Sequence, residues 1–168
     1  RLYKHYVHEG GISTPLVAHW PKGFVARGIA HTPSHVVDIL PTILEACGAS
    51  YQTEVGGHVI QPLQGESLLD LFKGNDWNRE QPIFWEHEGN AAIRYGQFKL
   101  VRLHDQPWEL YDIEVDRTEL TDLAGHKSDL ETDLIRKYCA WAERVGVMSW
   151  NEALPKLIQA WKMESVNG

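Results

Sequence analysis

Hydrophobic and polar residues alternate through the middle of the chain in short segments separated by turn residues. The segments predicted as strands are residues 83–87, 92–95, 98–102 and 108–113. Tight turns such as Glu88–Gly89–Asn90 and Gly96–Gln97 join them, which favours four antiparallel strands. Because Phe98 and Leu100 alternate with Lys99, we expect one covered face and one wetter face.

A helical pattern follows the predicted sheet. Its apolar stripe consists of Leu130, Leu134, Tyr138, Trp141 and Val145, which repeat at intervals of three or four residues. Ser128 and Glu131 are spaced as a capping box, and Gly146 is the expected end. We expect this helix to cover the sheet, so residues 81–168 are predicted to form a C-terminal subdomain. A weaker helical pattern occupies residues 149–163.

The first 80 residues have a different pattern. The apolar run Pro15–Pro21 predicts a strand buried on both faces. A largely buried helix is expected from about Thr32 to Gly48, kinked or divided at Pro41, with Asp38 in a structural role. Residues 49–65 are predicted as loop, and residues 65–74 as a short helix that ends at Gly74.

Composition excludes several classes of protein. The chain has 168 residues, of which 43% are hydrophobic and 23% charged, as is typical of a globular protein. A net charge of -7 argues against nucleic acid as a partner, and no apolar run approaches the roughly 20 residues that span a bilayer. Two cysteines make no disulfide framework. A Cys47–Cys139 bridge stays open, but Cys47 fits better as a small core residue.

The opening loop concentrates chemically active side chains. Lys4 can stabilise an oxyanion, and Gly10–Gly11 lets another group approach the backbone closely. His5 and His8 have a spacing that suits zinc on a helix, but histidines that form hydrogen bonds in a loop fit the glycine pair better. Glu9 either orients Lys4 or caps a backbone amide, and we favour the cap.

A second candidate site follows the first predicted strand. His87 lies between two carboxylates, Glu86 and Glu88, which is typical of an acid catalyst or a binding site but also of a polar strand end. Arg94 either binds an anionic group or pairs with Glu86 or Glu88 across the sheet. Seven tryptophans suit sugar stacking, but Trp20, Trp85, Trp108 and Trp141 lie in patterns that indicate core positions.

An ordered series of motifs resembles the sulfatase family, in particular the bacterial arylsulfatases. The motifs are Lys4, His8–Glu9–Gly10–Gly11, Pro15–Leu16–Val17, Trp20–Pro21, Asp38–Ile39–Leu40–Pro41–Thr42, Gly65–Glu66–Ser67–Leu68, Phe84–Trp85–Glu86–His87–Glu88–Gly89–Asn90, Phe98–Lys99–Leu100–Val101 and Glu109–Leu110–Tyr111–Asp112. The resemblance covers about residues 1–145 and corresponds to the last third of such an enzyme. It implies the C-terminal part of an α/β fold like that of alkaline phosphatase and the sulfatases. Residues 1–80 would then be the end of the large domain.

The resemblance also implies a function. Members hydrolyse sulfate esters with a formylglycine and a calcium ion, and Lys4 matches the catalytic lysine that contacts the sulfate group. Neither cysteine is followed by the C/S-x-P-x-R pattern that is converted to formylglycine. We therefore expect the nucleophile and the calcium ligands upstream of this chain, no metal ligands within it, and no activity of the chain alone. His87, Glu88 and Arg94 are predicted to bind substrate.

The expected partner is a sulfated small molecule or glycan, and the expected location is the periplasm or outside the cell. Two alternatives stay open: a phosphonate or phosphate monoester hydrolase of the same superfamily, and a non-catalytic carbohydrate-binding or interaction module. Unpaired sheet edges also predict a tendency to self-associate.

Overall fold

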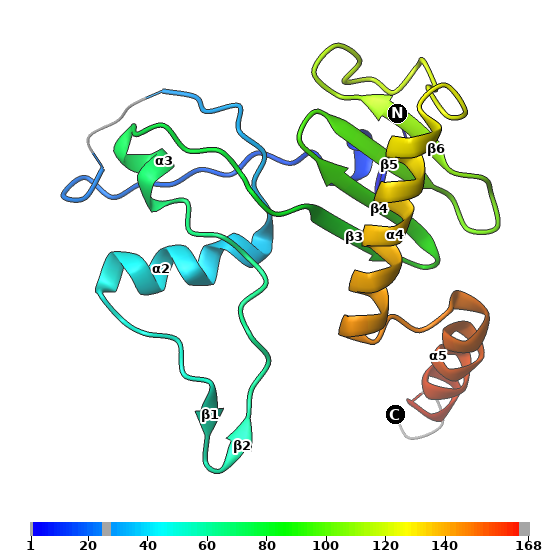
Figure 1. Ribbon diagram of the computed structural model, residues 1–168. Coiled ribbons are helices and arrows are strands. Elements are labelled where there is room, and N and C mark those ends of the chain that lie inside the picture. The colour runs from blue at the N-terminus through cyan, green and yellow to red at the C-terminus, as the bar shows by residue number, and fades with distance from the viewer. Residues whose placement is uncertain (1, 25–27, 165–168) are drawn as a thin grey trace. The chain divides into compact units, whose positions relative to one another are not determined.

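The computed structural model describes residues 2–24 and 28–164. Within them the chain forms two compact units (Figure 1). The helical unit consists of residues 15–81, and the sheet unit combines residues 2–14 with residues 82–164. Residues 2–14 therefore pack with the C-terminal part of the chain. The assignment of residues 1–80 to the end of a large α/β domain stays a prediction.

The sheet unit is built on four antiparallel strands in the order β3-β4-β5-β6 (Figure 1). They are β3 (Ile83–His87), β4 (Asn90–Tyr95), β5 (Phe98–Arg102) and β6 (Glu109–Asp112). Each strand pairs with the next one along the chain, as short turns require. The predicted antiparallel sheet is confirmed, with small differences at the ends of β4 and β6.

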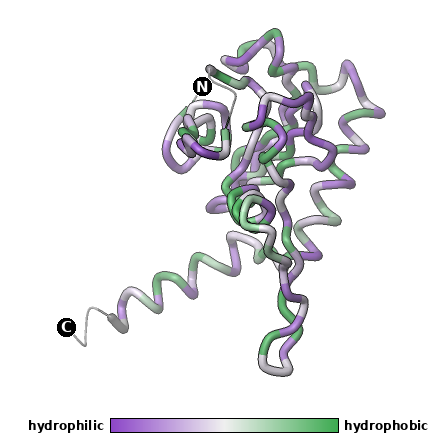
Figure 2. Tube along the Cα trace, turned by 90° about the vertical axis from the view of Figure 1, so that its left-hand side faces the viewer, coloured by the Kyte–Doolittle hydropathy of each residue, from purple (hydrophilic) through white to green (hydrophobic). Residues whose placement is uncertain are grey.

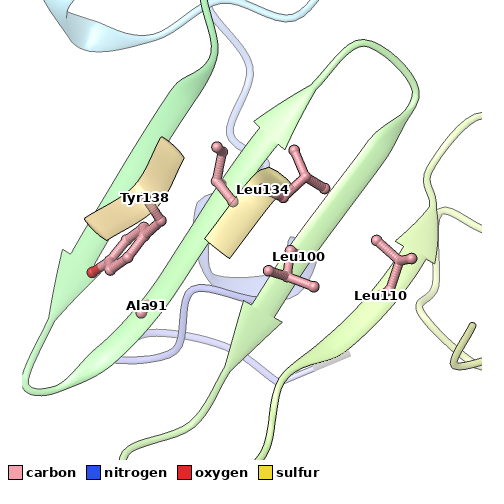
Figure 3. Packing of buried hydrophobic residues seen from close by; sticks show 6 residues of the cluster. Ala91, Leu100, Leu110, Leu134 and Tyr138 are labelled. Atoms are coloured by element: carbon pink, nitrogen blue, oxygen red, sulfur yellow. The ribbon is translucent and has the colours of Figure 1, made fainter. Parts of the chain in front are cut away.

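Helix α4 (Ser128–Val145) covers one face of this sheet, as predicted. Leu134 and Tyr138 are 0% and 5% exposed and pack against three strands (Figure 3). Their partners in the core cluster are Ala91, Ile93, Leu100 and Leu110. Each large side chain that is buried here contributes about 1.5–3 kcal/mol, so this cluster contributes substantially to the stability of the unit.

The beginning of α4 differs from the prediction. Lys127 precedes the helix and offers no side-chain cap, so the predicted capping box is wrong. The Glu131 carboxylate instead accepts a hydrogen bond from the Gly125 backbone N–H at 3.1 Å, and thereby fixes the turn before the helix. The predicted end is confirmed, because Gly146 takes a left-handed conformation with φ 73°.

The other face of the sheet is covered as well, so the predicted wetter face is wrong. Val7 packs there with Ala92, Val101 and Tyr111, and the short helix α1 (Glu9–Ile12) follows it. Alternation along β5 was read correctly, but the segment that covers the second face comes from the opposite end of the sequence. Local periodicity carries no information about such a contact.

The C-terminal helix α5 (Trp150–Glu164) confirms the weaker helical pattern, and Pro155 lies inside it. Hydrophobic and hydrophilic turns alternate along this helix (Figure 2). Leu154, Leu157 and Ile158 are 37–40% exposed. No helix among the described residues is both long and apolar enough to cross a bilayer.

The helical unit contains a 3-10 turn, η1 (Val36–Asp38), which leads directly into α2 (Ile39–Cys47). Pro41 lies in the first turn of α2, where its missing N–H has no intrahelical partner, so it neither kinks nor divides the helix. A later helix, α3 (Leu69–Lys73), ends at Gly74 as predicted. A small hairpin of β1 (Glu54–Val55) and β2 (His58–Val59) lies in the segment that was predicted as loop.

Two burial predictions in this unit are wrong. Residues Pro15–Pro21 form no strand, and Leu16 and Val17 are 51% and 87% exposed. Ile39 and Ile43 of α2 are exposed too and line an apolar hollow of about 270 Å³ with Leu16. The reason is that no strand among the described residues pairs with 15–21, so this apolar surface has nothing to pack against.

Asp38 has the predicted structural role. Its buried carboxylate accepts hydrogen bonds from the backbone N–H groups of His35 and Glu66, and it forms an ion pair with Arg79.

Cys47 and Cys139 are exposed free thiols, so Cys47 is no core residue. The expected tryptophan burial is met in the sheet unit, where residues 85, 108 and 141 are half-buried, but Trp20 is 40% exposed.

Candidate functional site

The opening loop is anchored to the sheet by a buried ion cluster. The Lys99 ammonium is fully buried and lies 3.0 Å from the Glu9 carboxylate and 2.8 Å from that of Glu119. Glu119 also accepts the backbone N–H of Glu9 at 2.9 Å. Glu9 therefore neither orients Lys4 nor caps a backbone amide, and both predicted alternatives are wrong. Its role is to fasten α1 to β5.

His8 adds a second buried connection. Its Nε2 lies 3.0 Å from a Glu109 carboxylate oxygen that also accepts the Tyr111 hydroxyl at 2.7 Å. The His8 side chain is fully buried, and its Nδ1 has no hydrogen-bond partner. His8 thus faces the interior, whereas His5 is exposed. The two histidines form separate contacts, as the hydrogen-bonding interpretation predicted.

At Gly11 the predicted close approach to the backbone is made by the chain itself, and neither glycine of the pair takes a positive φ. A Cβ at this position would lie 1.9 Å from the Tyr6 carbonyl oxygen, so no larger side chain fits. The loop therefore folds back on itself just after Lys4 and His5. This compact loop holds both side chains at one end of the sheet.

His5, His87 and Glu88 meet at the turn between β3 and β4. His5 Nδ1 lies 3.1 Å from His87 Nε2 and 3.3 Å from Glu88 Oε2. The two imidazole rings are nearly parallel, with centroids 5.4 Å apart. One ligand atom of each residue lies within 4.8 Å of the others. Residues 82 positions apart in the sequence thus form one exposed polar cluster.

The backbone around this cluster is held firmly. Buried Asn90 donates from Nδ2 to the carbonyl oxygens of His5 and His87, at 3.3 and 3.0 Å, and accepts the His104 N–H at 3.1 Å. Lys4 and Glu88 have φ angles of 63° and 54°, which non-glycine residues rarely adopt. Strained residues of this kind are concentrated at functional sites.

The predicted site residues are only partly brought together. Lys4 is exposed and directly precedes His5, so it is adjacent in sequence to the cluster that contains His87 and Glu88. Arg94 lies four residues along β4 from Asn90, a distance of roughly 14 Å. Its guanidinium donates to the Gly96 carbonyl at 3.4 Å, and burial lowers its pKa.

The strand register excludes one of the two interpretations of Arg94. Ile83 lies opposite Arg94 on β3, whereas Glu86 lies opposite Ala91. Pairing of Arg94 with Glu86 or Glu88 across the sheet is therefore wrong. Its predicted role in substrate binding stays a prediction.

Sequence reasoning missed Asn90 and the cation of the buried cluster. Asn90 was read only as a turn residue, and Lys99 only as a marker of a wet face. The one available signal was the position of Lys99 between Phe98 and Leu100 in a largely hydrophobic strand. That signal does not identify Glu9 and Glu119, which lie 90 and 20 residues away.

Comparison with known proteins identifies the family. The family described as N-sulphoglucosamine sulphohydrolase, C-terminal, matches residues 2–139. An uncharacterized sulfatase of Schizosaccharomyces pombe is 32% identical over 89% of this chain and 28% of its own length. A choline-sulfatase of Rhizobium meliloti is 31% identical over 73% of this chain and 23% of its own length.

Solved structures agree with the sequence matches. The crystal structure of Ps i-CgsB is 32% identical, with a TM-score of 0.60, over 74% of this chain and 27% of that protein. The same protein was solved in complex with k-i-k-neocarrahexaose. The chain spans about a quarter of the length of these relatives. The family match covers residues 2–139, which is most of the chain. The chain therefore belongs to the sulfatase family.

Proposed function

We propose that the protein to which this chain belongs hydrolyses sulfate esters. The observation that carries the proposal is the family match over residues 2–139, which includes Lys4 and the cluster beside it. As sulfate is transferred, negative charge grows on its oxygens and on the leaving oxygen. An ammonium group held beside the sulfate stabilises this charge, a role that we assign to Lys4, and losing one such group typically costs about 10²–10³ in rate.

The cluster beside Lys4 suits the remainder of the substrate. Imidazole N–H groups donate hydrogen bonds to hydroxyl or sulfate oxygens, and the Glu88 carboxylate accepts them from hydroxyl groups. We therefore assign His87 and Glu88 to substrate binding, with Arg94 reserved for a more distant part of an extended substrate. A sulfated glycan or a sulfated small molecule fits this arrangement. The relatives include both a choline-sulfatase and a protein solved with a carrageenan-type oligosaccharide.

Formylglycine and calcium do not fit the described residues. Two residues after Cys47 and Cys139 stand Ala49 and Trp141, where the modified motif requires proline. The cluster of three ligands contains two imidazoles, whereas calcium prefers oxygen ligands. We propose that the intact protein uses both groups, supplied by parts other than this chain. A periplasmic or secreted location also stays a prediction.

The test uses the full-length protein and an aryl sulfate. Lys4→Ala is expected to lower kcat/KM by about 10²–10³-fold, because one fixed charge at the sulfate is lost. Lys137→Ala, which removes a lysine of α4 that pairs with Asp133, is the matched control and should leave the rate unchanged. Equal rates for the Lys4→Ala variant and the wild type would exclude the proposed role. The 168-residue chain alone is expected to show no turnover.

A further inference from the structure

We propose that His5, His87 and Glu88 form a binding site for a divalent transition-metal ion, with zinc as the first candidate. The donor set is two imidazole nitrogens and one carboxylate oxygen. Zinc is bound by this combination of ligands, whereas calcium and magnesium prefer oxygen alone. The site is therefore chemically distinct from the calcium site that the family resemblance implies.

Two of the three distances between donor atoms are close to those of this ion, and the third is within 4.8 Å. Zinc lies about 2.0–2.1 Å from nitrogen ligands, so two ligands in a tetrahedral arrangement lie about 3.3–3.4 Å apart. His5 Nδ1 is 3.1 Å from His87 Nε2 and 3.3 Å from Glu88 Oε2. Without a metal, a single proton between the two imidazole nitrogens makes the contact a hydrogen bond. On metal binding, that proton would move to the other ring nitrogen of its histidine, so that both facing nitrogens present lone pairs, and the two atoms would separate by about 0.2–0.3 Å.

The supporting residues hold these ligands in place. The Asn90 side chain, which is only 7% exposed, donates to the backbone carbonyl of each histidine ligand. The Glu86 carboxylate accepts the Gly89 N–H at 2.9 Å and so fixes the turn that presents Glu88. Metal affinity depends strongly on such support around the ligands. One ligand comes from the opening loop, one from the end of β3 and one from the turn that follows it, so an ion would also link these segments.

Three protein ligands leave one tetrahedral position open. In zinc proteins that position takes water or an oxygen of a bound molecule. The proposal goes beyond the proposed function: with the ion bound, His87 and Glu88 would contact substrate through the open metal position and not directly. Its test concerns binding of the metal alone and does not depend on hydrolysis. The histidine pair that was considered in the sequence, His5 with His8, is not this site, since His8 faces the interior.

The experiment is isothermal titration of the metal-free 168-residue chain with zinc chloride, followed by cobalt(II) absorption spectroscopy. We expect one zinc per chain and a visible spectrum typical of four-coordinate cobalt. His5→Gln and His87→Gln should each weaken binding by at least about 10-fold, since each removes a direct ligand. His126→Gln, which alters an exposed histidine elsewhere in the sheet unit, should bind as the wild type does.

Two results would overturn the proposal: no saturable zinc binding, or wild-type affinity in both ligand variants. The ligand side chains of His5 and Glu88 are 50% and 40% exposed, so variants at this site should fold, and thermal unfolding without metal verifies this. Calcium chloride is the comparison ion and should not compete for the site. Because no sulfate ester is present, the outcome is independent of the test of hydrolysis.

Discussion

Replacing the buried Lys99 is the most direct test of how the sheet unit is stabilised. Lys99→Met keeps most of the side-chain length but removes the charge shared by Glu9 and Glu119. Those carboxylates are 8% and 0% exposed, so water cannot replace the lost cation. The substitution therefore leaves two buried negative charges close to one another.

The magnitude follows from the two contact distances. At an effective dielectric constant of about 20, contacts of 3.0 and 2.8 Å each give roughly 5–6 kcal/mol of direct attraction. Removing three charged groups from water offsets much of this attraction. Variants that delete one partner of a buried ion pair typically lose about 3–5 kcal/mol, and we expect a loss of that size for Lys99→Met.

Hydrogen exchange of the β4 and β5 amides measures this loss in the sheet unit alone. Lys137→Met is the matched control, because its ion pair with Asp133 has side chains 29% and 37% exposed and is worth at most about 1 kcal/mol. Exchange should also accelerate in α1, which Glu9 fastens to the sheet. A loss below about 1 kcal/mol for Lys99→Met would contradict the argument, since the cluster would then contribute no more than a surface pair.

Three further outcomes are expected in the sheet unit. Gly89→Ala should cost about 2–5 kcal/mol in thermal unfolding, because φ is +82° and the new Cβ would lie 2.6 Å from His104 Nδ1. Gly96→Ala, at φ +58° with open space around it, should cost only about 1–2 kcal/mol, and equal losses would exclude the steric argument. Burial raises the pKa of Tyr138 to about 12. The unfolded chain then binds fewer protons on this side chain between pH 10 and 12, so Tyr138 should lower stability by about 2–3 kcal/mol over that range. Tyr138→Phe should remove this share of the fall in urea titrations. Trp141→Ala should cost about 3 kcal/mol in urea denaturation, because its ring stacks on a phenylalanine of β3 at 4.9 Å; a loss below 1 kcal/mol would contradict that.

The sequence by itself determined the elements whose signals are local. Alternation and tight turns predicted β3 to β6, and the apolar stripe predicted α4 and its end at Gly146. The ordered series of motifs over residues 1–145 also suggested the family that the comparisons show. The strands and the helix depend on interactions between residues that are close in sequence, so the pattern along the chain is sufficient to predict them.

Only the tertiary structure decided which surfaces are covered and which side chains meet. The sequence predicts that Lys99 faces solvent, whereas the structure places Glu9 and Glu119 around it. The sequence likewise predicts an ordinary loop histidine at His5, whereas the structure places His87 beside it. For the apolar run at residues 15–21 the error was the reverse: burial was predicted, but the segment is exposed because no described strand covers it. Burial depends on partners that are distant in sequence, and periodicity within one segment cannot specify them.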